Sequence, residues 1–210
     1  MNTRCYIVGA GDYCDGFLPE SCDFVIAADN GYTELINRGI TPDLVVGDFD
    51  SLVDIPPHPH VIRSPVEKDD TDVMLAVREG MARGFEVYII NGGLGGRLDH
   101  SLANIQILMY IAKRGARGYL LGRNMCVTVI KDSSISFKSG ATGLISVFCG
   151  YGRAEGVTLT GLKYPLSNAA VTCDFPIGVS NEFTGVPAVI SVLSGVLIIM
   201  WTGGVDLVES

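Results

Sequence analysis

The chain has 210 residues, of which 48% are hydrophobic, and this is enough for one large domain or two small ones with packed cores. Its formal net charge is -8, with 15 lysines and arginines against 23 acidic residues. Affinity for nucleic-acid phosphates comes from Lys and Arg side chains, so this balance argues against a nucleic-acid-binding protein. An acidic protein that takes a polyphosphate substrate needs a metal ion to neutralise it.

The six cysteines form no C-x-x-C pair, and three lie in apolar, strand-like runs. We therefore expect free thiols that pack in the core of a protein in a reducing cytosol, rather than a disulfide or a zinc site. Residues 1–11 contain no apolar stretch long enough for a signal peptide. The apolar stretch at residues 189–201 is interrupted by Ser and Gly and falls short of a membrane span. We expect a cytoplasmic protein that binds no membrane.

Through about residue 123, short β-rich runs alternate with helical patterns. Strands are predicted at residues 6–8, 24–28, 44–46, 61–62, 87–90 and 119–121. Their continuous apolar character is typical of a parallel sheet that is buried on both faces. Apolar residues at helical spacing predict helices over residues 71–83 and 98–114, each followed by a glycine. We therefore expect an α/β domain over residues 1–123 with a mostly parallel, Rossmann-like sheet.

From about residue 124 the helical period disappears. Strands separated by glycines are predicted at residues 126–130, 144–148, 157–159, 188–193 and 196–201. The last two meet at Ser194 and Gly195, which predicts a tight hairpin. We expect residues 124–210 to form an all-β sandwich.

Polar residues follow several of the predicted strands directly. In an open parallel sheet, ligands bind beyond the carboxyl ends of the strands. Asp29, Asp48, Asp50 and Asn91 all come at such positions, so we expect them to converge on one edge of the sheet.

Residues 47–51, with the sequence GDFDS, are the first candidate for metal binding. Asp48 and Asp50 are two positions apart and face the same side of an extended chain, so both carboxylates can reach one Mg²⁺ ion. A solvated acidic turn is the alternative for this motif alone.

Residues 68–72, with the sequence KDDTD, precede the first predicted helix. Asp70 or Thr71 can cap that helix. Asp72 can be a third metal ligand, and Lys68 can meet a phosphate as a compact charge. Helix capping explains one acid but not all three, although it remains the alternative when this segment is taken alone.

Residues 91–97 contain four glycines between a predicted strand and a predicted helix. The glycines let the backbone approach an anion, and Arg97 and the helix N-terminus add positive potential. No G-K-[ST] follows, so this is not a Walker A loop, and Cys14 replaces the third glycine of a dinucleotide fingerprint at residues 9–14. A structural turn remains the alternative. Asp99 and His100 fit alcohol activation, or equally a capping Asp and a surface His.

Six motifs, taken together and in order, resemble the thiamine pyrophosphokinase family from about residue 25 to the end of the chain. They are ADNG at residues 28–31, PDLVVGDFDS at 42–51, EKDDTD at 67–72, GGRLDH at 95–100 with Ala103 and Asn104, GLKY at 161–164, and SNE at 180–182. The resemblance implies a cytosolic homodimer with an α/β domain and a β-sandwich. It also implies transfer of the β,γ-pyrophosphoryl group of ATP to the hydroxyl of thiamine, giving thiamine pyrophosphate and AMP.

The same resemblance implies roles for individual residues. The Mg²⁺ ligands and catalytic acids would be Asp48, Asp50 and Asp72. The ATP and transfer region would be lined by Asp29, Asn30, Gly31, Lys68, Asp69, Gly95, Gly96, Arg97 and Asp99, with Arg97 and Asp99 also catalytic. Thiamine would be bound by Tyr164, Ser180 and Asn181, next to Asp99. Many relatives have Trp where this chain has Tyr164, which leaves a smaller stacking area.

Two other functions remain as alternatives. An aspartate-nucleophile phosphohydrolase also uses D-x-D after a strand, with Asp48 forming a phosphoenzyme, but Leu52 stands where its D-x-D-x-[TV] signature has Thr or Val. A non-catalytic nucleotide- or thiamine-binding module would not require three convergent carboxylates.

Overall fold

The computed structural model describes residues 4–49, 57–63 and 70–209, which divide into two compact units. Unit 1 contains Met1–Ile107 and Leu120–Arg123, and unit 2 contains Leu108–Tyr119 and Asn124–Ser210. The division passes through helix α3 (Leu98–Ala112) and strand β6 (Arg117–Gly122), so each unit holds part of both elements. The domain division predicted at residues 123 and 124 stays a prediction.

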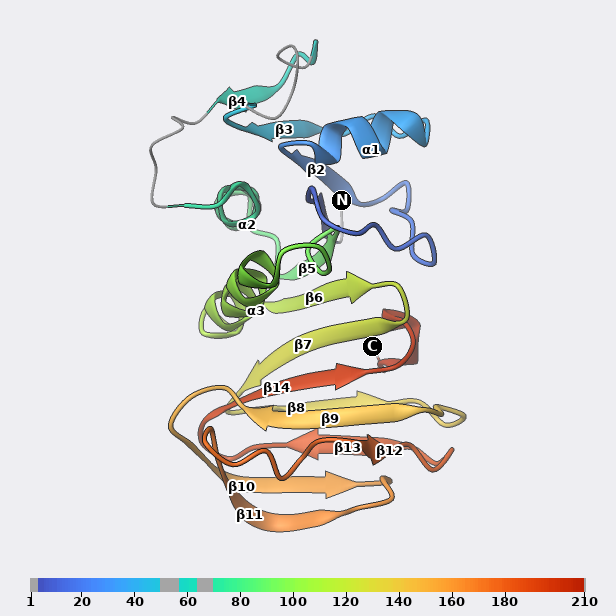
Figure 1. The fold of residues 1–210 in the computed structure, drawn as a ribbon, viewed down its shortest axis with the longest axis vertical. Helices are drawn as coiled ribbons and strands as arrows, with labels where there is room; N and C mark the ends of the chain where they lie inside the picture. Colours follow the sequence, from blue (N-terminus) through green and yellow to red (C-terminus); the bar gives the residue numbers. More distant parts are fainter. Residues whose placement is uncertain (1–3, 50–56, 64–69, 210) are drawn as a thin grey trace. The chain divides into compact units, whose positions relative to one another are not determined.

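Unit 1 is built on a parallel sheet with the strand order β5-β1-β2-β3-β4 (Figure 1). Its strands are β1 (Cys5–Val8), β2 (Phe24–Ala28), β3 (Leu44–Gly47), β4 (Val61–Arg63) and β5 (Val87–Asn91). Every pairing among these five is parallel, as predicted. All residues of β1 and β3 are buried, which is the physical reason that both strands read as uninterrupted apolar runs.

Helices α1 (Gly31–Asn37) and α2 (Asp72–Ala82) pack on this sheet, α1 against β1 and β2, and α2 against β1, β2 and β3. The predicted helices at 71–83 and 98–114 are confirmed as α2 and α3, whereas α1 was not predicted. Thr71 is the N-cap of α2, because its Oγ1 accepts a hydrogen bond from the backbone N–H of Met74 at 3.2 Å. With seven residues, α1 is too short to show a clear helical period.

Parallel pairing directs the carboxyl ends of the strands toward one edge of the unit 1 sheet. Asp29 follows β2, Asp48 follows β3, and Asn91 ends β5. Backbone hydrogen bonds join neighbouring strand ends, from Asp29 N to Val46 O at 2.8 Å and from Gly9 N to Asn91 O at 2.8 Å. The predicted convergence of these three positions on one edge is therefore confirmed, while Asp50 lies outside the described residues.

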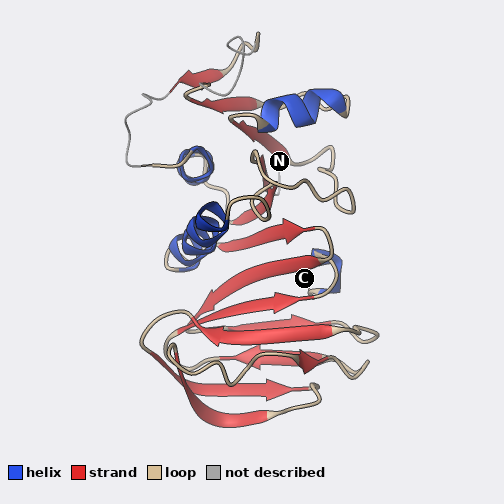
Figure 2. Ribbon diagram, in the orientation of Figure 1, coloured by secondary structure: helices blue, strands red, loops and turns tan. Residues whose placement is uncertain are grey.

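Unit 2 contains two antiparallel sets of strands. One has the order β12-β9-β14-β7 and the other β11-β10-β13-β8. The first consists of β7 (Met125–Lys131), β9 (Leu144–Cys149), β12 (Asn181–Glu182) and β14 (Val196–Trp201). The second consists of β8 (Ser134–Phe137), β10 (Arg153–Thr160), β11 (Leu166–Thr172) and β13 (Ala188–Ser191). A 3-10 helix at Val205–Leu207 follows β14. Among the described residues, the α-helices all precede β6 in the chain, and Figure 2 distinguishes these helices in blue from the strands in red.

The predicted hairpin at Ser194 and Gly195 is wrong. Strand β13 pairs with β8 and β10, whereas β14 pairs with β7 and β9, so the two consecutive strands belong to different sheets. The connection is fixed by a hydrogen bond from Gly195 N to Asp132 Oδ1 at 2.7 Å. A Cβ on Gly195 would lie 2.8 Å from the Cα of Ala154, so glycine is needed here for a close backbone approach rather than for a two-residue turn.

Aromatic rings connect the two sheets of unit 2. The ring of Phe137 in β8 lies 5.2 Å from that of Trp201 in β14, edge to face, and 5.1 Å from that of Phe183. The indole N–H of Trp201 donates to the carbonyl of Gly204 at 3.0 Å, as a buried Trp requires.

No helix within the described ranges has the length and apolar character needed to span a membrane.

Candidate active site

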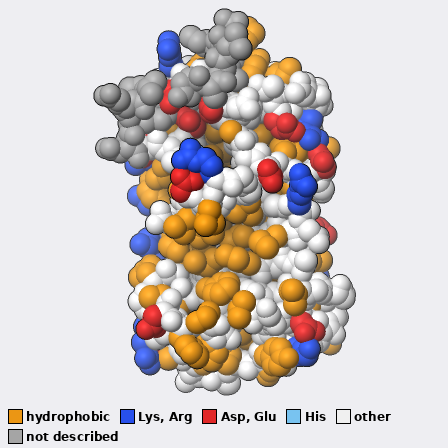
Figure 3. Space-filling model, in the orientation of Figure 1, with side chains coloured by type: hydrophobic (Ala, Val, Ile, Leu, Met, Phe, Trp, Pro, Cys, Tyr) orange, Lys and Arg blue, Asp and Glu red, His pale blue; other side chains and the backbone are white. Residues whose placement is uncertain are grey.

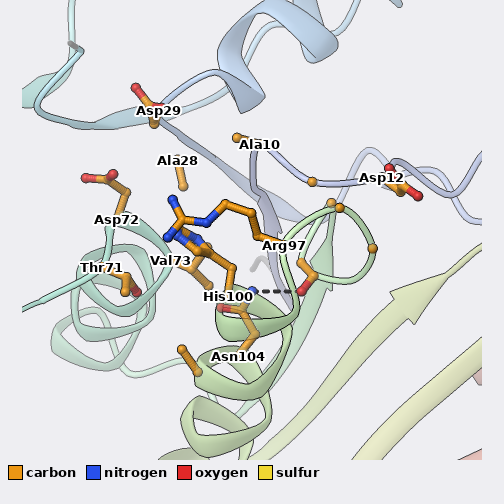
Figure 4. A pocket seen from close by; sticks show the side chains of 16 residues that line it. Ala10, Asp12, Ala28, Asp29, Thr71, Asp72, Val73, Arg97, His100 and Asn104 are labelled. Carbon is orange, nitrogen blue, oxygen red and sulfur yellow. Dashed lines mark hydrogen bonds between the residues drawn. The ribbon is translucent and has the colours of Figure 1, made fainter. Parts of the chain in front are cut away.

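A pocket of about 460 Å³ lies at the carboxyl edge of the unit 1 sheet (Figure 4). Its walls come from the loop after β1, the end of β2, the start of α2, the glycine loop after β5 and the first turns of α3. Four chain segments that are distant in sequence therefore meet in one cavity, the last of them running from the glycine loop into α3. The position is the one where ligands bind in open parallel sheets.

Acidic side chains occupy two sides of this pocket. Figure 4 shows Asp29 and Asp72 on one side of the view and Asp12 on the other, with Arg97 between them. Asp29 has a left-handed backbone with φ of 50° directly after β2, and strained backbone of this kind is concentrated at functional sites. Asp72 is the first residue of α2, so its carboxylate also lies near the positive end of that helix.

The other predicted acids have different surroundings. Asp48 is half-buried after β3, and a Cβ on the preceding Gly47 would lie 3.2 Å from the Cα of Asp29, so the ends of β2 and β3 approach closely. Asp70 forms an ion pair with Arg78 at 2.8 Å. Three predicted site residues, Asp50, Lys68 and Asp69, lie outside the described residues.

The donor set of the pocket suits a hard cation. Among residues 4–49, 57–63 and 70–209, no three His, Cys, Asp or Glu side chains are grouped so that they could hold a metal ion. Mg²⁺, however, is usually bound by one or two carboxylates together with oxygens of the substrate phosphates and water. Asp29 and Asp72 both line this cavity, so the residues present fit a Mg²⁺ ion that arrives with a polyphosphate.

The glycine loop forms a wall of the pocket with its backbone. Gly95 has φ of +83°, and a Cβ at this position would lie 2.4 Å from Oδ2 of Asp12. Asn104 of α3 donates a hydrogen bond from Nδ2 to the carbonyl of Gly93 at 2.8 Å, which fixes the loop to the helix. Gly95 and Gly96 both line the pocket, so an anion there can approach the backbone without obstruction from side chains.

Arg97 and Asp99 form a bidentate ion pair beside this loop. Arg97 donates from Nε to Oδ1 of Asp99 at 3.1 Å and from Nη2 to Oδ2 at 2.6 Å. These bonds from Arg97 are the main cause that lowers the pKa of Asp99 to about 2. Both side chains are exposed, and Arg97 lines the pocket together with His100. A carboxylate with so low a pKa is a weak general base, whereas it holds the guanidinium in a defined orientation.

Of the residues predicted to bind thiamine, Tyr164, Ser180 and Asn181 belong to unit 2, whereas Asp99 belongs to unit 1. Asn181 is buried, and its Oδ1 accepts from the backbone N–H groups of Tyr164 at 2.9 Å and Glu182 at 2.8 Å. Its Nδ2 donates to the carbonyl of Tyr164 at 2.7 Å. Ser180 has φ of 58°, and its N–H donates to Oγ of Ser146 at 3.1 Å. The amide of Asn181 thus holds the backbone of Tyr164, which is 58% exposed and has Nζ of Lys163 5.4 Å from the centroid of its ring.

The loop after β1 was not assigned to the site from the sequence. Ala10, Gly11 and Asp12 line the pocket, although the spacing of glycines here does not match a dinucleotide fingerprint. The glycines directly after a buried strand were the available signal, because this position in a parallel sheet places the loop at the ligand-binding edge.

A parallel α/β sheet with carboxylates, an arginine and a glycine loop at its carboxyl edge defines an enzyme that handles phosphate groups. Residues 17–120 match the family model described as "Thiamin pyrophosphokinase, catalytic domain". Residues 132–197 match the model described as "Thiamin pyrophosphokinase, vitamin B1 binding domain". The chain belongs to the thiamin pyrophosphokinase family, which confirms the resemblance identified in the sequence.

Individual relatives show the same similarity over most of the chain. The thiamine pyrophosphokinase of Bacillus subtilis is 29% identical over 184 residues, which is 83% of this chain and 85% of the relative. A crystal structure of the Bacillus subtilis enzyme has a TM-score of 0.86 and 28% identity, covering 96% of this chain and 100% of that one. A crystal structure of a family protein from Enterococcus faecalis has a TM-score of 0.82 and 29% identity, covering 96% and 99%.

Proposed function

We propose that this protein transfers the β,γ-pyrophosphoryl group of ATP to the hydroxyl of thiamine. The hydroxyl oxygen bonds to the β-phosphorus, the bond from that phosphorus to the α,β-bridging oxygen breaks, and AMP leaves. The hydroxyl proton is released to a base or to solvent. The observation that carries this proposal is one pocket containing Asp29, Asp72, Arg97 and a glycine loop, in a chain whose two halves match the two domains of the thiamin pyrophosphokinase family.

We infer that unit 1 has a Rossmann-like sheet. ATP would bind along the carboxyl edge of this sheet. The phosphates would lie over Gly95 and Gly96, with Arg97 donating to their oxygens. Asp29, Asn30 and Gly31, at the end of β2 and the start of α1, would line the same site. Lys68 and Asp69 are proposed to contribute as well, although they lie outside the described residues.

We propose that Mg²⁺ is held by Asp72, which lines the pocket, together with Asp48 after β3 and with Asp50, which lies outside the described residues. Bound there, the ion would neutralise charge on the phosphate oxygens. Asp29 shares the cavity with Asp72 and would add to the negative field that attracts the cation.

Catalysis in this proposal depends on positioning and on electrostatic stabilisation, since phosphoryl chemistry demands little covalent help from the protein. Arg97 would stabilise the charge that develops on the transferred group. Asp99 would act mainly by orienting Arg97, because their bidentate pair keeps the carboxylate ionised.

Thiamine would bind through residues of unit 2, which we infer forms a β-sandwich. The exposed ring of Tyr164 would stack on the cationic thiamine rings, a contact of about 0.5–2 kcal/mol. Ser180 and Asn181 would complete the site, with Asn181 fixing the backbone of Tyr164.

We further propose that the chain has two functional domains, residues 1–123 and residues 124–210. We also propose a cytoplasmic location.

A homodimer is proposed as the working form. Large hydrophobic side chains are exposed in both units, including Leu98, Leu102, Phe175 and Ile177. Hydrophobic side chains are also visible on the face drawn in Figure 3. Exposed apolar area of this kind is typical of surfaces that bind a protein partner, and sedimentation equilibrium would measure the mass of the assembly.

The decisive experiment incubates the protein with Mg-ATP and thiamine and identifies the products by mass spectrometry. We expect AMP and thiamine pyrophosphate in equal amounts, formed only when both substrates are present. ADP with thiamine monophosphate would show transfer of the γ-phosphoryl group and contradict the mechanism. A phosphoenzyme on Asp48 would favour the phosphohydrolase, and binding of ATP or thiamine without turnover would favour a non-catalytic module.

A further inference from the structure

Asn91, the last residue of β5, has a fully buried side chain in which every hydrogen-bonding position is used. Its Oδ1 accepts from the backbone N–H groups of Cys14 at 2.8 Å and Gly92 at 2.9 Å. Its Nδ2 donates to the carbonyl of Cys14 and to the hydroxyl of Tyr6, both at 2.9 Å. A side-chain amide has two donors and two acceptor lone pairs, so Asn91 satisfies its own polar groups and both backbone groups of Cys14.

These bonds join the loop after β1 to the glycine loop after β5. Backbone hydrogen bonds run alongside them, from Gly11 N to Gly92 O at 2.7 Å and from Asp12 N to Leu94 O at 3.0 Å. Tyr6 extends the connection, because its hydroxyl accepts from Asn91 and donates to the carbonyl of Phe17 at 2.5 Å. Burial raises the pKa of the Tyr6 phenol, which keeps this donor protonated.

The two joined segments are neighbouring parts of the pocket wall, and their backbones are in close contact. A Cβ on Gly11 would lie 2.6 Å from the carbonyl oxygen of Gly92, and a Cβ on Gly92 would lie 2.5 Å from that of Gly9. Gly11, Asp12, Gly92 and Gly95 all line the cavity. This part of the pocket wall therefore consists of two contacting backbone segments that Asn91 holds together.

We infer that Asn91 is a positioning residue for ATP, which acts by holding the loop at residues 9–14 against the glycine loop so that both present their backbone to the nucleotide. This inference rests on the proposed function. A preformed wall lowers the entropy lost when the ligand binds. Without Asn91, the N–H and carbonyl of Cys14 lose their buried partners and the loop separates from the wall. Thiamine, proposed to bind in unit 2, should be unaffected.

The test compares Asn91→Asp and Asn91→Leu, which keep the approximate size of the side chain, with Thr128→Val. Thr128 is fully buried in β7, and its Oγ1 donates to the carbonyl of Gly118 at 2.7 Å, so this control loses a buried side-chain hydrogen bond in unit 2. Both Asn91 variants should raise the KM for ATP about tenfold or more, with the KM for thiamine unchanged and kcat changed less than KM. Thr128→Val should lower the melting temperature without changing the KM for ATP.

A milder variant and a measurement without substrate cover the case in which Asn91 variants fail to fold. Tyr6→Phe removes one of the four bonds to Asn91 and should raise the KM for ATP about two- to threefold. In the unmodified protein, the amides of Gly11, Asp12 and Cys14 should exchange with solvent as slowly as those of β1. Fast exchange there, or an unchanged KM for ATP in folded Asn91 variants, would overturn the inference. Neither result depends on which products the enzyme makes, so failure of the proposed reaction would be recognised separately.

Discussion

Asp99 follows Arg97 by two residues and takes two hydrogen bonds from its guanidinium, at 3.1 and 2.6 Å. The backbone N–H of His100 donates a further bond to the same carboxylate at 3.0 Å. All three bonds favour the ionised form. The carboxylate of Asp99 therefore orients the guanidinium of Arg97 beside the glycine loop, and the protonation of Asp99 depends on Arg97.

Replacing Arg97 should raise the pKa of Asp99. In Arg97→Gln we expect that pKa to rise from about 2 toward the ordinary value of 3.8, because the largest cause of the shift is removed. The measurement is an NMR titration of the Asp99 carboxyl carbon. Because the pKa of Asp99 is lower in the folded protein, the ion pair adds to the free energy of unfolding above pH 3.8, and this contribution is lost as the pH falls toward 2. The contribution is small, because both side chains are exposed.

Asp132 is the matched control for this titration. Its pKa is lowered mainly by Lys131 in unit 2, and it should titrate identically in both proteins. If the pKa of Asp99 stayed near 2 without Arg97, the bidentate pair could not be its cause. Activity gives a second readout: Asp99→Asn should retain more kcat than Arg97→Gln, since Asp99 is proposed to act through Arg97.

For individual residues, the sequence predicted the site where the residue type by itself indicates a role, such as a carboxylate, a glycine or an arginine. Asp29, Asp72, Gly95, Gly96 and Arg97 were all predicted site residues and line one pocket. Asn91 was predicted only as a strand-end residue, because its partner Cys14 is 77 positions away and such a bond leaves no local pattern. The role of Asp12 was missed for the same reason, since only the folded sheet brings its loop to Gly95.

At the scale of elements, burial explains both the successes and the error. Fully buried strands such as β1 and β3 were found because they are continuously apolar. Strands β13 and β14 were also found, but a hairpin and a crossing between two sheets both require two apolar strands and a glycine. The pairing of β13 with β8 and of β14 with β9 depends on strands far along the chain, so the local sequence could not distinguish the two arrangements.

The loop after β1 offers a direct test of how closely its backbone must approach the glycine loop. Gly11→Ala places a Cβ 2.6 Å from Gly92 O and 3.0 Å from Leu94 O. Since these neighbours are backbone atoms that cannot move alone, we expect a loss of about 1–3 kcal/mol in the free energy of unfolding. We also expect an increase in the KM for ATP. Urea denaturation and steady-state kinetics measure the two effects.

Gly16→Ala, in the same loop, is the matched control. A Cβ there meets only the Sγ of Cys14, at 3.8 Å, which is an ordinary contact. This variant should be neutral or slightly stabilising, because alanine reduces the freedom of the unfolded chain. Equal effects of the two substitutions would mean that the wall tolerates displacement, contrary to the close approach described for Gly11.

On the scale of the whole molecule, the two units divide the proposed substrates between them. The described residues that line the phosphate pocket all belong to unit 1, and Tyr164, Ser180 and Asn181 belong to unit 2. The change from helical to purely β-type periodicity near residue 124 predicted two halves of different architecture. The exact division was less accessible, because α3 and β6 each contribute to both units and no linker composition marks a boundary.

Hydrogen exchange should therefore give a separate footprint for each substrate. Mg-ATP alone should slow exchange in residues 9–12 and 92–97, by up to about a hundredfold at a hundred times its dissociation constant where exchange requires the ligand to leave. Thiamine alone should act on residues 163–164 and 180–182. The internal control is the segment at residues 57–63. It includes strand β4 and lines no part of the phosphate pocket. Because each ligand is added alone, protection of the unit 1 loops by thiamine, or of Tyr164 and Asn181 by Mg-ATP, would contradict the assignment of one substrate to each unit.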